Sequence, residues 1–521
     1  MTDLDTAAGE GLRRRRSGGR EGHARSAGPQ QPPWAQPRMR YQPTEVVSAD
    51  ELESIHLGSL RVLSEIGMDF LDADAREVLR AAGAQVTPDS QRVRFDPAMV
   101  TELIKTAPAQ FTLHARNPER NVELGGDWVA FGTVGSPPNV ADLDRGRRIG
   151  NRVDYQNLLR LGQSLNAVHF LSGYPVEPVD LHHSVRHLLA SYDALTLMDK
   201  AVHCYSLGRQ RNIDVLEMVR IARGVDAATI DREPSVFTVV NSSSPLRLDA
   251  PMLQGIMEFA AHNQVVCITP FTLAGAMAPV TLAGALVEQN AEALAGMVLT
   301  QAVNPGAPVI YGGFTSNVDM QSGAPAFGTP EGMRTSMIGG QLARRYGVPY
   351  RSSNVNASNA LDAQAAYESV FSLWGAIMGG VNLVMHGAGW MEGGLHASYE
   401  KMVLDAELLG MVAAFLDPVV VDDETMAFEA MREVGPGGHF FGAEHTQSRY
   451  RTAFHKPMLS DWRNYETWQE AGSPELPSKA NRIWKELLEA YQPPPMDPAI
   501  HEELEAFVAR RVAEGGVPTD Y

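Results

Sequence analysis

Eight apolar segments of strand length alternate with helical segments along most of this chain. Helix-start signals lie between them: Asp249 precedes a helix with Pro251 in its first turn, Thr329 stands before Pro330, and Asp362 opens a third helix. Strands that alternate with helices form parallel sheets, and eight such units favour a closed (β/α)₈ TIM barrel over an open doubly wound sheet. The expected strands, rich in β-branched and aromatic residues, are 128–133, 168–174, 201–207, 236–241, 265–271, 308–314, 348–352 and 383–387.

The α/β barrel is expected to carry additions at both ends. Ser48 and Glu51 have the spacing of a helix capping box, and short helices are expected at 74–83 and 96–107. Terminal helices are expected at 480–491 and 497–514, after a segment rich in glycine, histidine and aromatic residues. The expected parts are a disordered basic tail (1–40), an N-terminal helical cap (41–125), the barrel (126–420) and a C-terminal excursion with helices packed on the barrel (421–521).

The composition excludes several classes of protein. The net charge of −18 argues against nucleic-acid binding, which needs a basic surface. Only Cys204 and Cys267 are present, too few for a disulfide framework, so we expect a reducing compartment and a cytoplasmic protein. No apolar run is long enough for a membrane helix, and no apolar segment follows the arginine cluster at 13–16 as a signal peptide would require.

The active site of such a barrel is built from loops at the carboxyl ends of the strands. The ends of the expected strands are rich in glycine, serine and aromatic residues, as in Tyr311-Gly312-Gly313-Phe314. Glycine and serine also mark ordinary turns, and aromatic residues can simply cap a barrel core. As a set, however, aromatic side chains around a closed pocket suit a quaternary ammonium, which has no N–H donor and is held by aromatic faces.

No metal site is expected. His183 and His187 are four residues apart on an expected helix, but no glutamate or cysteine pair accompanies them, so a surface helix is the preferred interpretation. His439 and His445 flank Glu444, where hydrogen-bonding roles are preferred over metal binding. The sequence contains no phosphate-binding loop, no strand-GxGxxG-helix unit, no nucleophile elbow and no CxxC motif.

Six segments of the chain are distinctive: NSSSPLRLD (241–249), VVCITPFTLAG (265–275), PVIYGGFTSNVDM (308–320), DAQAAYES (362–369), HGAGWMEGGL (386–395) and LSDWRNYETW (459–468). In this order and spacing they resemble the trimethylamine methyltransferase family of corrinoid-dependent enzymes. The resemblance runs from about residue 41 to about residue 484 and implies a TIM barrel, a methyl acceptor that is a corrinoid on a small partner protein, and a methylated amine as donor.

One departure from the family bears on the substrate. The trimethylamine enzymes of the family carry pyrrolysine after the seventh strand, whereas this chain has ordinary residues over 354–360, with Asn359 nearest the special position. Family members without pyrrolysine are similar to glycine betaine and related quaternary-amine methyltransferases. A quaternary amine departs as a neutral tertiary amine and needs no Lewis acid, whereas methanol would need zinc. We expect no bound metal and no acid–base pair.

On this basis we name candidate residues for substrate binding but none for catalysis. Arg351 could pair with a substrate carboxylate, and Glu392 is a candidate carboxylate near the cation. The expected pocket aromatics are Tyr174, Phe271, Tyr311, Phe314 and Trp390, and the expected polar contacts are Asn241, Asn354 and His386.

Two alternatives remain open. Another TIM-barrel enzyme, of aldolase or isomerase type, would need a lysine or a pair of carboxylates at the strand ends. A non-catalytic barrel that binds quaternary amines is the other. The expected partners are a corrinoid protein, the amine and further copies of the same chain, with neither nucleic acid nor membrane.

Overall fold

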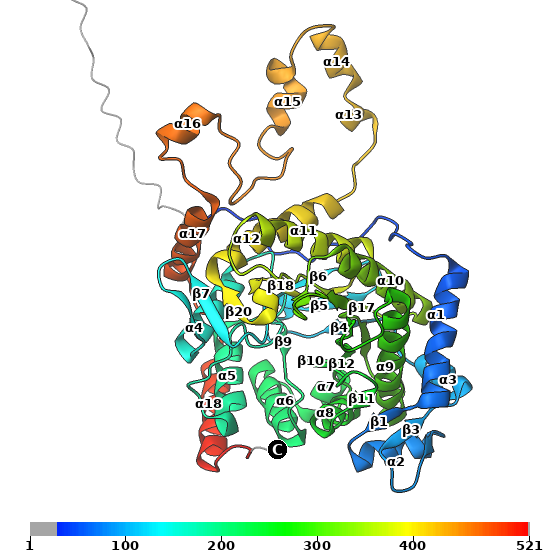
Figure 1. The fold of residues 1–521 in the computed structure, drawn as a ribbon. Coiled ribbons are helices and arrows are strands. Elements are labelled where there is room, and N and C mark those ends of the chain that lie inside the picture. The colour runs from blue at the N-terminus through cyan, green and yellow to red at the C-terminus, as the bar shows by residue number, and fades with distance from the viewer. Residues whose placement is uncertain (1–28, 519–521) are drawn as a thin grey trace, which may run out of the picture.

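A parallel sheet that closes on itself forms the centre of the molecule (Figure 1). The computed structural model describes residues 29–518. Seven strands are hydrogen-bonded in the order β6-β18-β17-β14-β12-β10-β9. Their bounds are β6 (Ala130–Thr133), β9 (Val202–His203), β10 (Val236–Val240), β12 (Val265–Ile268), β14 (Val309–Gly312), β17 (Tyr350–Ser353) and β18 (Leu383–Ala388).

The ring is closed by Phe170, which pairs in parallel with Gly132 of β6 on one side and with Ala201 on the other. The expected strand 168–174 is thus present at its place in the barrel, but only as a single bridging residue. Contact is close here, because a Cβ on Gly132 would collide with the Phe170 ring and with Ser172. The eightfold (β/α) barrel expected from the sequence is confirmed.

Side chains inside the barrel come from alternate residues of each strand. One buried cluster fills the interior near the strand starts, and it includes Phe170, Phe237, Val265, Ile310 and Leu383. A hairpin of β4 (Gln110–Leu113) and β5 (Val122–Gly125) adds further apolar side chains to this cluster. The amino-terminal end of the barrel is therefore packed shut, and only the carboxyl end is free to hold a ligand.

The outer helices begin where the sequence signals lie. Asp249, Thr329 and Asp362 are N-caps whose side chains accept hydrogen bonds from first-turn amides, as expected. The helices are α4 (Arg152–Ser164), α5 (His183–Leu197), α6 (Arg209–Arg223), α7 (Ala227–Arg232), α8 (Ala250–Ala261), α9 (Leu282–Val303), α10 (Pro330–Tyr346), α11 (Ala363–Met378) and α12 (Tyr399–Leu416).

The N-terminal segment packs on the outside of the barrel against α9. The capping box of Ser48 and Glu51 is confirmed. The segment also contains strands, which the sequence analysis did not expect. Its further elements are α1 (Ala49–Arg61), η1 (Val62–Ile66), β1 (Met68–Phe70), α2 (Ala73–Ala81), β2 (Gln85–Val86), β3 (Arg92–Arg94), α3 (Pro97–Ile104) and η2 (Pro118–Arg120).

The loops after the barrel strands carry small sheets of their own. One has the order β19-β20-β7-β8 and joins loops from the first and eighth units; another has the order β13-β15-β16. β11 pairs with β1. The bounds are β7 (Asn139–Asp142), β8 (Gly146–Ile149), β11 (Arg247–Leu248), β13 (Leu273–Ala274), β15 (Ser316–Val318), β16 (Pro325–Ala326), β19 (Trp390–Met391), η3 (Glu392–Gly394) and β20 (His396–Ser398).

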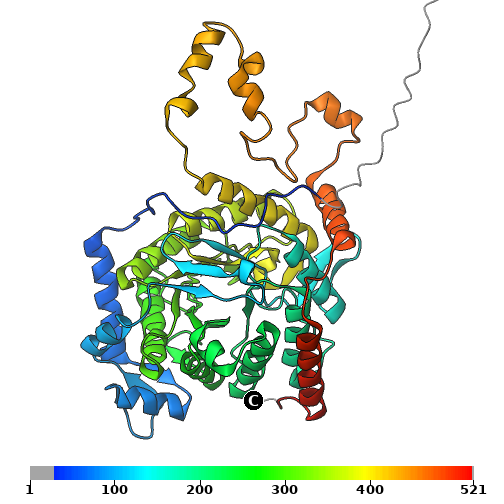
Figure 2. The same cartoon turned by 180° about the vertical axis from the view of Figure 1, so that it is seen from behind.

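The C-terminal part divides into a projecting arm and two docked helices. We call residues 419–475 the arm, because this segment stands away from the barrel in both views (Figures 1 and 2). It was expected to pack on the barrel, as α17 (Leu476–Ala490) and α18 (Pro498–Ala513) do on α12 and α5. The arm contains α13 (Asp423–Met426), α14 (Phe428–Val434), η4 (Phe440–Gly442), α15 (Glu444–Arg449) and α16 (Tyr465–Glu470).

Among the described residues, no helix has the length and apolar character needed to cross a membrane. The basic tail expected at 1–40 lies mostly outside the described residues, which begin at 29. Cys204 and Cys267 are free and buried.

A fully buried ion pair supports the carboxyl end of β18. Lys401 Nζ lies 2.5 Å from Asp405 Oδ1 on α12, and both side chains are inaccessible to solvent. The second Asp405 oxygen accepts the backbone N–H of Gly389 at 2.8 Å, one residue beyond β18. Burial lowers the pKa of Lys401, against the charge and the hydrogen bond of Asp405. The pair thus holds the turn from β18 into β19.

This pair generates a stability prediction. Replacing Lys401 with Met should lower the free energy of unfolding by about 3–5 kcal/mol, because Asp405 is left buried and unpaired. The double variant Lys401→Met/Asp405→Leu should recover most of that loss. Urea unfolding followed by fluorescence measures both. A double variant less stable than the single one would contradict this account of the pair.

Candidate functional site

A cavity of about 270 Å³ lies at the carboxyl ends of the barrel strands. All eight β/α units contribute to its wall. A larger hollow, lined by residues 30–40 and α12, does not reach the carboxyl ends of the strands. The wall residues are Gly135, Ser136, Ser172, His203, Tyr205, Val239, Asn241, Met252, Thr269, Phe271, Phe314, Arg351, Met385, His386 and Trp390. Because the opposite end of the barrel is packed shut, we take this cavity as the candidate active site.

Arg351 is the charged side chain of this wall within the described chain. Its residue is 2% exposed, yet no ion pair to it is found among residues 29–518. One guanidinium nitrogen donates a long hydrogen bond, 3.4 Å, to the carbonyl of Gly313, while Nε is buried without a partner. Burial lowers the pKa of Arg351 to about 10, so the group remains a cation at neutral pH. A buried, unpaired cation is costly and favours an anionic ligand.

Aromatic rings surround the guanidinium. Phe314 lies under Arg351, with the guanidinium carbon 5.2 Å from the ring centroid. The Phe314 centroid is 5.0 Å from that of Phe271 and 6.4 Å from that of Trp390. Tyr205 faces the same cavity from the third unit. These four rings follow the ends of their barrel strands, whereas Arg351 is within β17.

Two histidines in the wall are neutral. His203 Nε2 accepts the N–H of Val239 at 3.2 Å, which places its proton on Nδ1, a buried atom without a partner. His386 Nδ1 accepts the N–H of Gly135 at 3.2 Å, so its proton lies on Nε2. Burial lowers the pKa of His203 to about 3. Burial, with the charge of Arg351, holds the pKa of His386 well below its usual value. Both rings are therefore hydrogen-bond donors without charge.

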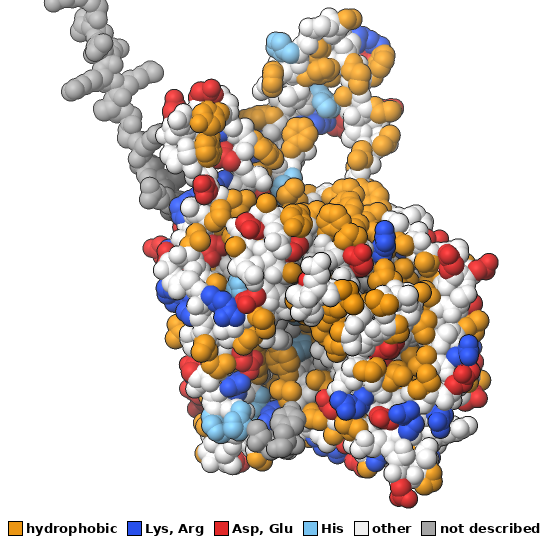
Figure 3. All heavy atoms as spheres, viewed as in Figure 1, with side chains coloured by type: hydrophobic (Ala, Val, Ile, Leu, Met, Phe, Trp, Pro, Cys, Tyr) orange, Lys and Arg blue, Asp and Glu red, His pale blue; other side chains and the backbone are white. Residues whose placement is uncertain are grey.

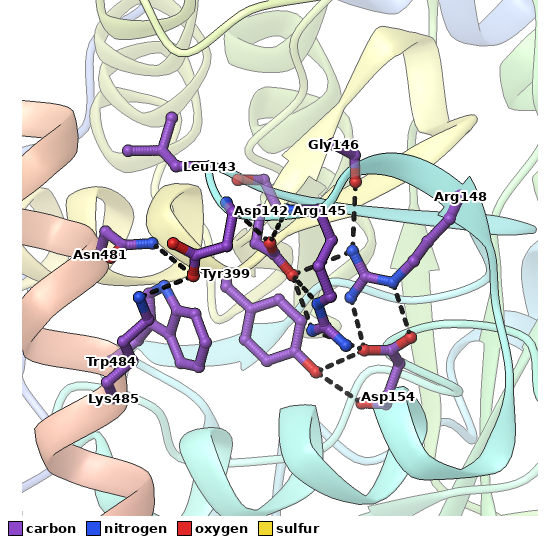
Figure 4. A network of polar contacts seen from close by, with 12 residues as sticks. Asp142, Leu143, Arg145, Gly146, Arg148, Asp154, Tyr399, Asn481, Trp484 and Lys485 are labelled. Atoms are coloured by element: carbon purple, nitrogen blue, oxygen red, sulfur yellow. Dashed lines mark hydrogen bonds and ion pairs between the residues drawn. The ribbon is translucent and has the colours of Figure 1, made fainter.

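Trp390 is held over the cavity by the small sheet of β7, β8, β19 and β20. A charged cluster anchors this sheet to α4 and α12 (Figure 4). Arg148 donates to Asp154 at 2.6 Å, and Arg145 donates to Asp142 at 2.7 Å. The Tyr399 hydroxyl donates to the same Asp154 at 2.9 Å. Burial would raise the pKa of Asp154, but hydrogen bonds from Arg148 and Tyr399 outweigh it and lower the pKa.

A second anchor connects the β7–β8 turn to the C-terminal helix α17. Glu400 is buried and accepts hydrogen bonds from the Leu143 backbone, from Asn481 and from the Trp484 indole, the last at 2.9 Å. The labelled donors of this contact stand together beside the cluster in Figure 4. The wall around Trp390 therefore depends on residues that are far apart in the sequence.

The structure brings six of the ten candidate residues into the cavity wall: Asn241, Phe271, Phe314, Arg351, His386 and Trp390. Tyr311 is not one of them. It follows the inward-facing Ile310 by one residue, so it points outward, where its hydroxyl contacts Gln289 and Asn290 of α9. Two-residue alternation read from the apolar core would have shown this.

The other three candidates lie near the wall but outside it. Tyr174 lies behind Tyr205, with the ring centroids 4.8 Å apart. Asn354 donates to the carbonyl of Gly387 at 3.0 Å and does not line the cavity. Glu392 contacts Arg147 at 2.7 Å and His396 at 2.8 Å, so its charge is already paired. Burial would raise its pKa, but the hydrogen bonds from these two partners lower it.

The sequence analysis did not single out several wall residues, among them Ser136, Ser172, His203, Tyr205 and Thr269. Ser172, Tyr205 and Thr269 stood at recognised strand ends. His203 is two residues before Tyr205 on the same strand face, so alternation could have found it. Nothing in the local sequence marks Ser136, which reaches the wall through its hydrogen bond to the Tyr205 hydroxyl at 2.7 Å.

The segment 354–360 is held by buried polar contacts. Glu368 accepts the N–H groups of Ala357 and Ser358, each at 2.9 Å. Asn359 is exposed and lies outside the cavity wall. His183 and His187 were expected on a surface helix; His183 is exposed on α5, but His187 is buried and contacts Asp214 at 2.9 Å. Within residues 29–518, no group of three or more histidine, cysteine or acidic side chains is arranged to hold a metal ion.

The sequence of this chain is similar to proteins of one family. The family model described as "Trimethylamine methyltransferase (MTTB)" matches residues 13–516. A glycine betaine methyltransferase of Desulfitobacterium hafniense strain Y51 is 39% identical over 90% of this chain and 98% of its own length. A trimethylamine methyltransferase of D. hafniense strain DCB-2 is 30% identical over 90% of this chain and 94% of its own. One from Methanosarcina barkeri is 28% identical over 88% and 94%.

Among solved structures, the M. barkeri monomethylamine methyltransferase is 13% identical and covers 84% of this chain and 93% of its own, with a TM-score of 0.48.

The two neutral histidines generate a pH prediction. The affinity of the cavity for acetate, a bare carboxylate probe, should be constant between about pH 5.5 and 8, because only Arg351 is charged there. Calorimetric titration measures it, and Arg351→Met supplies the control without an anion site. If His203 or His386 instead titrated near its ordinary value, a second positive charge would appear as the pH fell. Affinity would then rise below about pH 6.5, which would contradict the assignment.

Proposed function

Because the chain belongs to the trimethylamine methyltransferase family, we propose that it moves a methyl group from a carboxylated quaternary amine of the glycine betaine type to the Co(I) of a corrinoid on a partner protein. The name of the relative that is 39% identical supports this substrate class. The observation that carries the proposal is the buried guanidinium of Arg351, which has no acidic partner in the described chain.

The charge of the cavity distinguishes between kinds of quaternary amine. A substrate with a carboxylate offers Arg351 a charge-assisted, two-point hydrogen bond. A purely cationic amine such as choline would add a second positive charge to a cavity whose described wall holds Arg351 and no acid. The zwitterion is therefore favoured on charge alone.

The aromatic rings suit the other end of the same molecule. With the carboxylate held at Arg351 inside the barrel, the ammonium group would lie toward Phe271, Trp390 and Tyr205, beyond the strand ends. Each cation–π contact contributes roughly 0.5–2 kcal/mol, more when water is excluded. The buried atoms His203 Nδ1, Ser172 Oγ and Trp390 Nε1 lack partners and are available as further donors.

The reaction requires the protein mainly to position the substrate. The corrinoid, held by its own protein, would supply the Co(I) nucleophile that accepts the methyl group. The C–N bond breaks with its electrons on nitrogen, which leaves as a neutral tertiary amine. No proton moves, in keeping with two histidines that stay neutral. The chain's residues orient the methyl group and exclude water, which is the positional component of catalysis.

The size of the cavity supports a separate carrier for the corrinoid. About 270 Å³ suits a small amine but has no room for a corrin ring as well. The corrinoid would therefore be presented at the open, carboxyl end of the barrel by its own protein. That partner would meet the loops that carry Ser136, Phe271 and Trp390.

Arg351 provides the central test. Arg351→Met should lower kcat/KM for glycine betaine roughly 10- to 150-fold, the loss of a charged hydrogen bond of about 1.5–3 kcal/mol. Choline turnover should not fall, because the repelling charge is removed. Arg351→Lys should lie between, since ammonium lacks the two-point geometry. The assay is methyl-corrinoid formation from Co(I) cobalamin across a panel of methylated amines that includes trimethylamine.

The unliganded Arg351→Met protein provides the folding control. It should melt at or above the temperature of the parent, because an unpaired buried charge has been removed. Equal loss of betaine and choline turnover would show that Arg351 is structural. Turnover of trimethylamine with every quaternary amine inert would refute the substrate class, and binding of betaine without methyl transfer would identify a binding protein instead.

The aromatic wall has a matched pair of variants. Phe271→Ala should weaken betaine binding by roughly 0.5–2 kcal/mol, since it removes a ring from the cavity. Tyr311→Phe should leave binding unchanged, because its hydroxyl contacts α9 and its ring lies outside the cavity. Calorimetric dissociation constants compare the two. A larger effect from Tyr311→Phe than from Phe271→Ala would contradict the cavity described here.

A further inference from the structure

The arm is attached at its root and, beyond it, stands away from the rest of the described chain. The chain enters the arm at the end of α12 and returns along the same helix. There the buried Glu407 accepts the Met458 N–H at 2.7 Å and the Ser460 hydroxyl at 3.0 Å. His455 lies against Gly410 of α12. The rest of the arm projects from this edge of the barrel (Figures 1 and 2).

The arm exposes an unusual amount of apolar surface. Its most exposed aromatic side chains, each between 57% and 84% accessible, are Phe428, Phe441, Tyr450, Phe454, Trp462 and Tyr465. At roughly 150–250 Å² for a whole aromatic side chain, they present on the order of 800 Å². That equals about one partner's share of a standard protein interface and exceeds the largest apolar patch of a typical monomer, about 300–600 Å².

A second bare apolar surface lies beside the root of the arm, on the outward faces of α11 and α12. It includes Tyr367, Val370, Phe371, Met411 and Phe415, each 41–54% exposed. We call it the α11–α12 face. Trp374 joins its two helices, with its ring centroid 5.0 Å from that of Phe415. Figure 3 shows hydrophobic side chains gathered on the arm and on the edge of the barrel below it.

The α11–α12 face carries no charged side chain. The two helices contain five charged residues, and all are turned inward and at most 6% exposed: Glu368, Glu400, Lys401, Asp405 and Glu407. The outer helices of a barrel in water ordinarily present charge to solvent. Depletion of charge together with enrichment in aromatic residues is the mark of the centre of a protein interface.

We propose that these two surfaces cover each other between two copies of the chain: the arm of one copy packs on the α11–α12 face of the other, and the reverse. Twofold symmetry closes such an exchange, because the arm of each copy meets the α11–α12 face of the other. Both surfaces lie on one chain and adjoin at α12, so a single axis buries both. The estimated area of the arm satisfies what a stable dimer needs.

The position of the surfaces argues for a second copy rather than the corrinoid protein. α11 and α12 lie on the outer wall of the barrel, whereas the candidate active site opens at the carboxyl ends of the strands. A partner that delivers a methyl acceptor must reach that opening. The dimer would leave it free on both copies, and the inference does not depend on which amine is the substrate.

The mass in solution gives the first test. Light scattering at micromolar concentration should give twice the 56.7 kDa of one chain. Phe371→Glu/Met411→Glu on the face and Phe441→Glu/Phe454→Glu on the arm should each weaken dimerisation at least tenfold. Val280→Glu, on a residue 65% exposed outside both surfaces, is the matched control and should not change it. Unchanged circular dichroism verifies that each variant folds.

Disulfide trapping tests the pairing itself. Both natural cysteines are buried, so a surface cysteine is a clean reporter. Cysteine is placed on the arm at Phe428, Phe441 or Phe454 of one tagged chain, and on the face at Phe371 or Met411 of another. At least one mixture should form a disulfide between the two chains, and no arm-only variant should form one with itself.

Every other outcome overturns the proposal. A monomer at micromolar concentration, a dimer insensitive to both sets of variants, or a dimer in which no mixture is trapped would each exclude the exchange. Arm-to-arm disulfides would show that the arms pair with each other. If the chain is monomeric and the variants lose methyl transfer to a corrinoid protein but not to free cobalamin, the surface belongs to that protein instead.

Discussion

Alternation of side chains along eight parallel strands is the constraint on which the rest of this structure depends. In a closed barrel, one residue of each neighbouring pair points into the interior and the next points toward the outer helices. This places Arg351 in the cavity and sends Tyr311, from the adjacent strand, toward α9. The interior near the strand starts is filled by apolar side chains and the β4–β5 hairpin, so chemistry is confined to one end.

A charge is retained at that end at some cost in stability. The guanidinium of Arg351 is buried without an acid among the described residues, and two neighbouring histidines stay neutral because they are buried. A cavity with one fixed cation and several aromatic faces is complementary to a small zwitterion. Charges are paired just behind the surrounding wall, at Lys401 with Asp405 and at Arg148 with Asp154. These ion pairs thus position the residues that surround the unpaired guanidinium of Arg351.

The outer surface of the barrel is unusually apolar at α11 and α12. The outer helices α6, α7 and α10 each carry an exposed charged side chain. By contrast, α11 and α12 turn all of theirs inward, where they hold the 354–360 segment, the β18 turn and the root of the arm. Their outer faces are left apolar. The same inward charges therefore support the active-site loops and leave the α11–α12 face bare, which links the architecture of the site to the surface proposed for a second copy.

The sequence by itself determined the class of fold, the eight strand positions, the helix caps at Asp249, Thr329 and Asp362, and the residues at the strand ends. These features are local, because period, propensity and capping act over a few residues. Six of the ten candidate site residues reach the cavity for this reason. Tyr311 was misplaced although the alternation was available in the sequence.

Only the tertiary structure decided the rest. It reduced the second strand to Phe170, paired the charge of Glu392 with Arg147, and brought Ser136 to the wall through Tyr205. It also showed that Arg351 has no acidic partner among residues 29–518 and that the arm stands away from the barrel. Each of these depends on contacts between residues far apart in the chain, and whether a charge or an apolar side chain finds a partner is decided only when those distant segments meet.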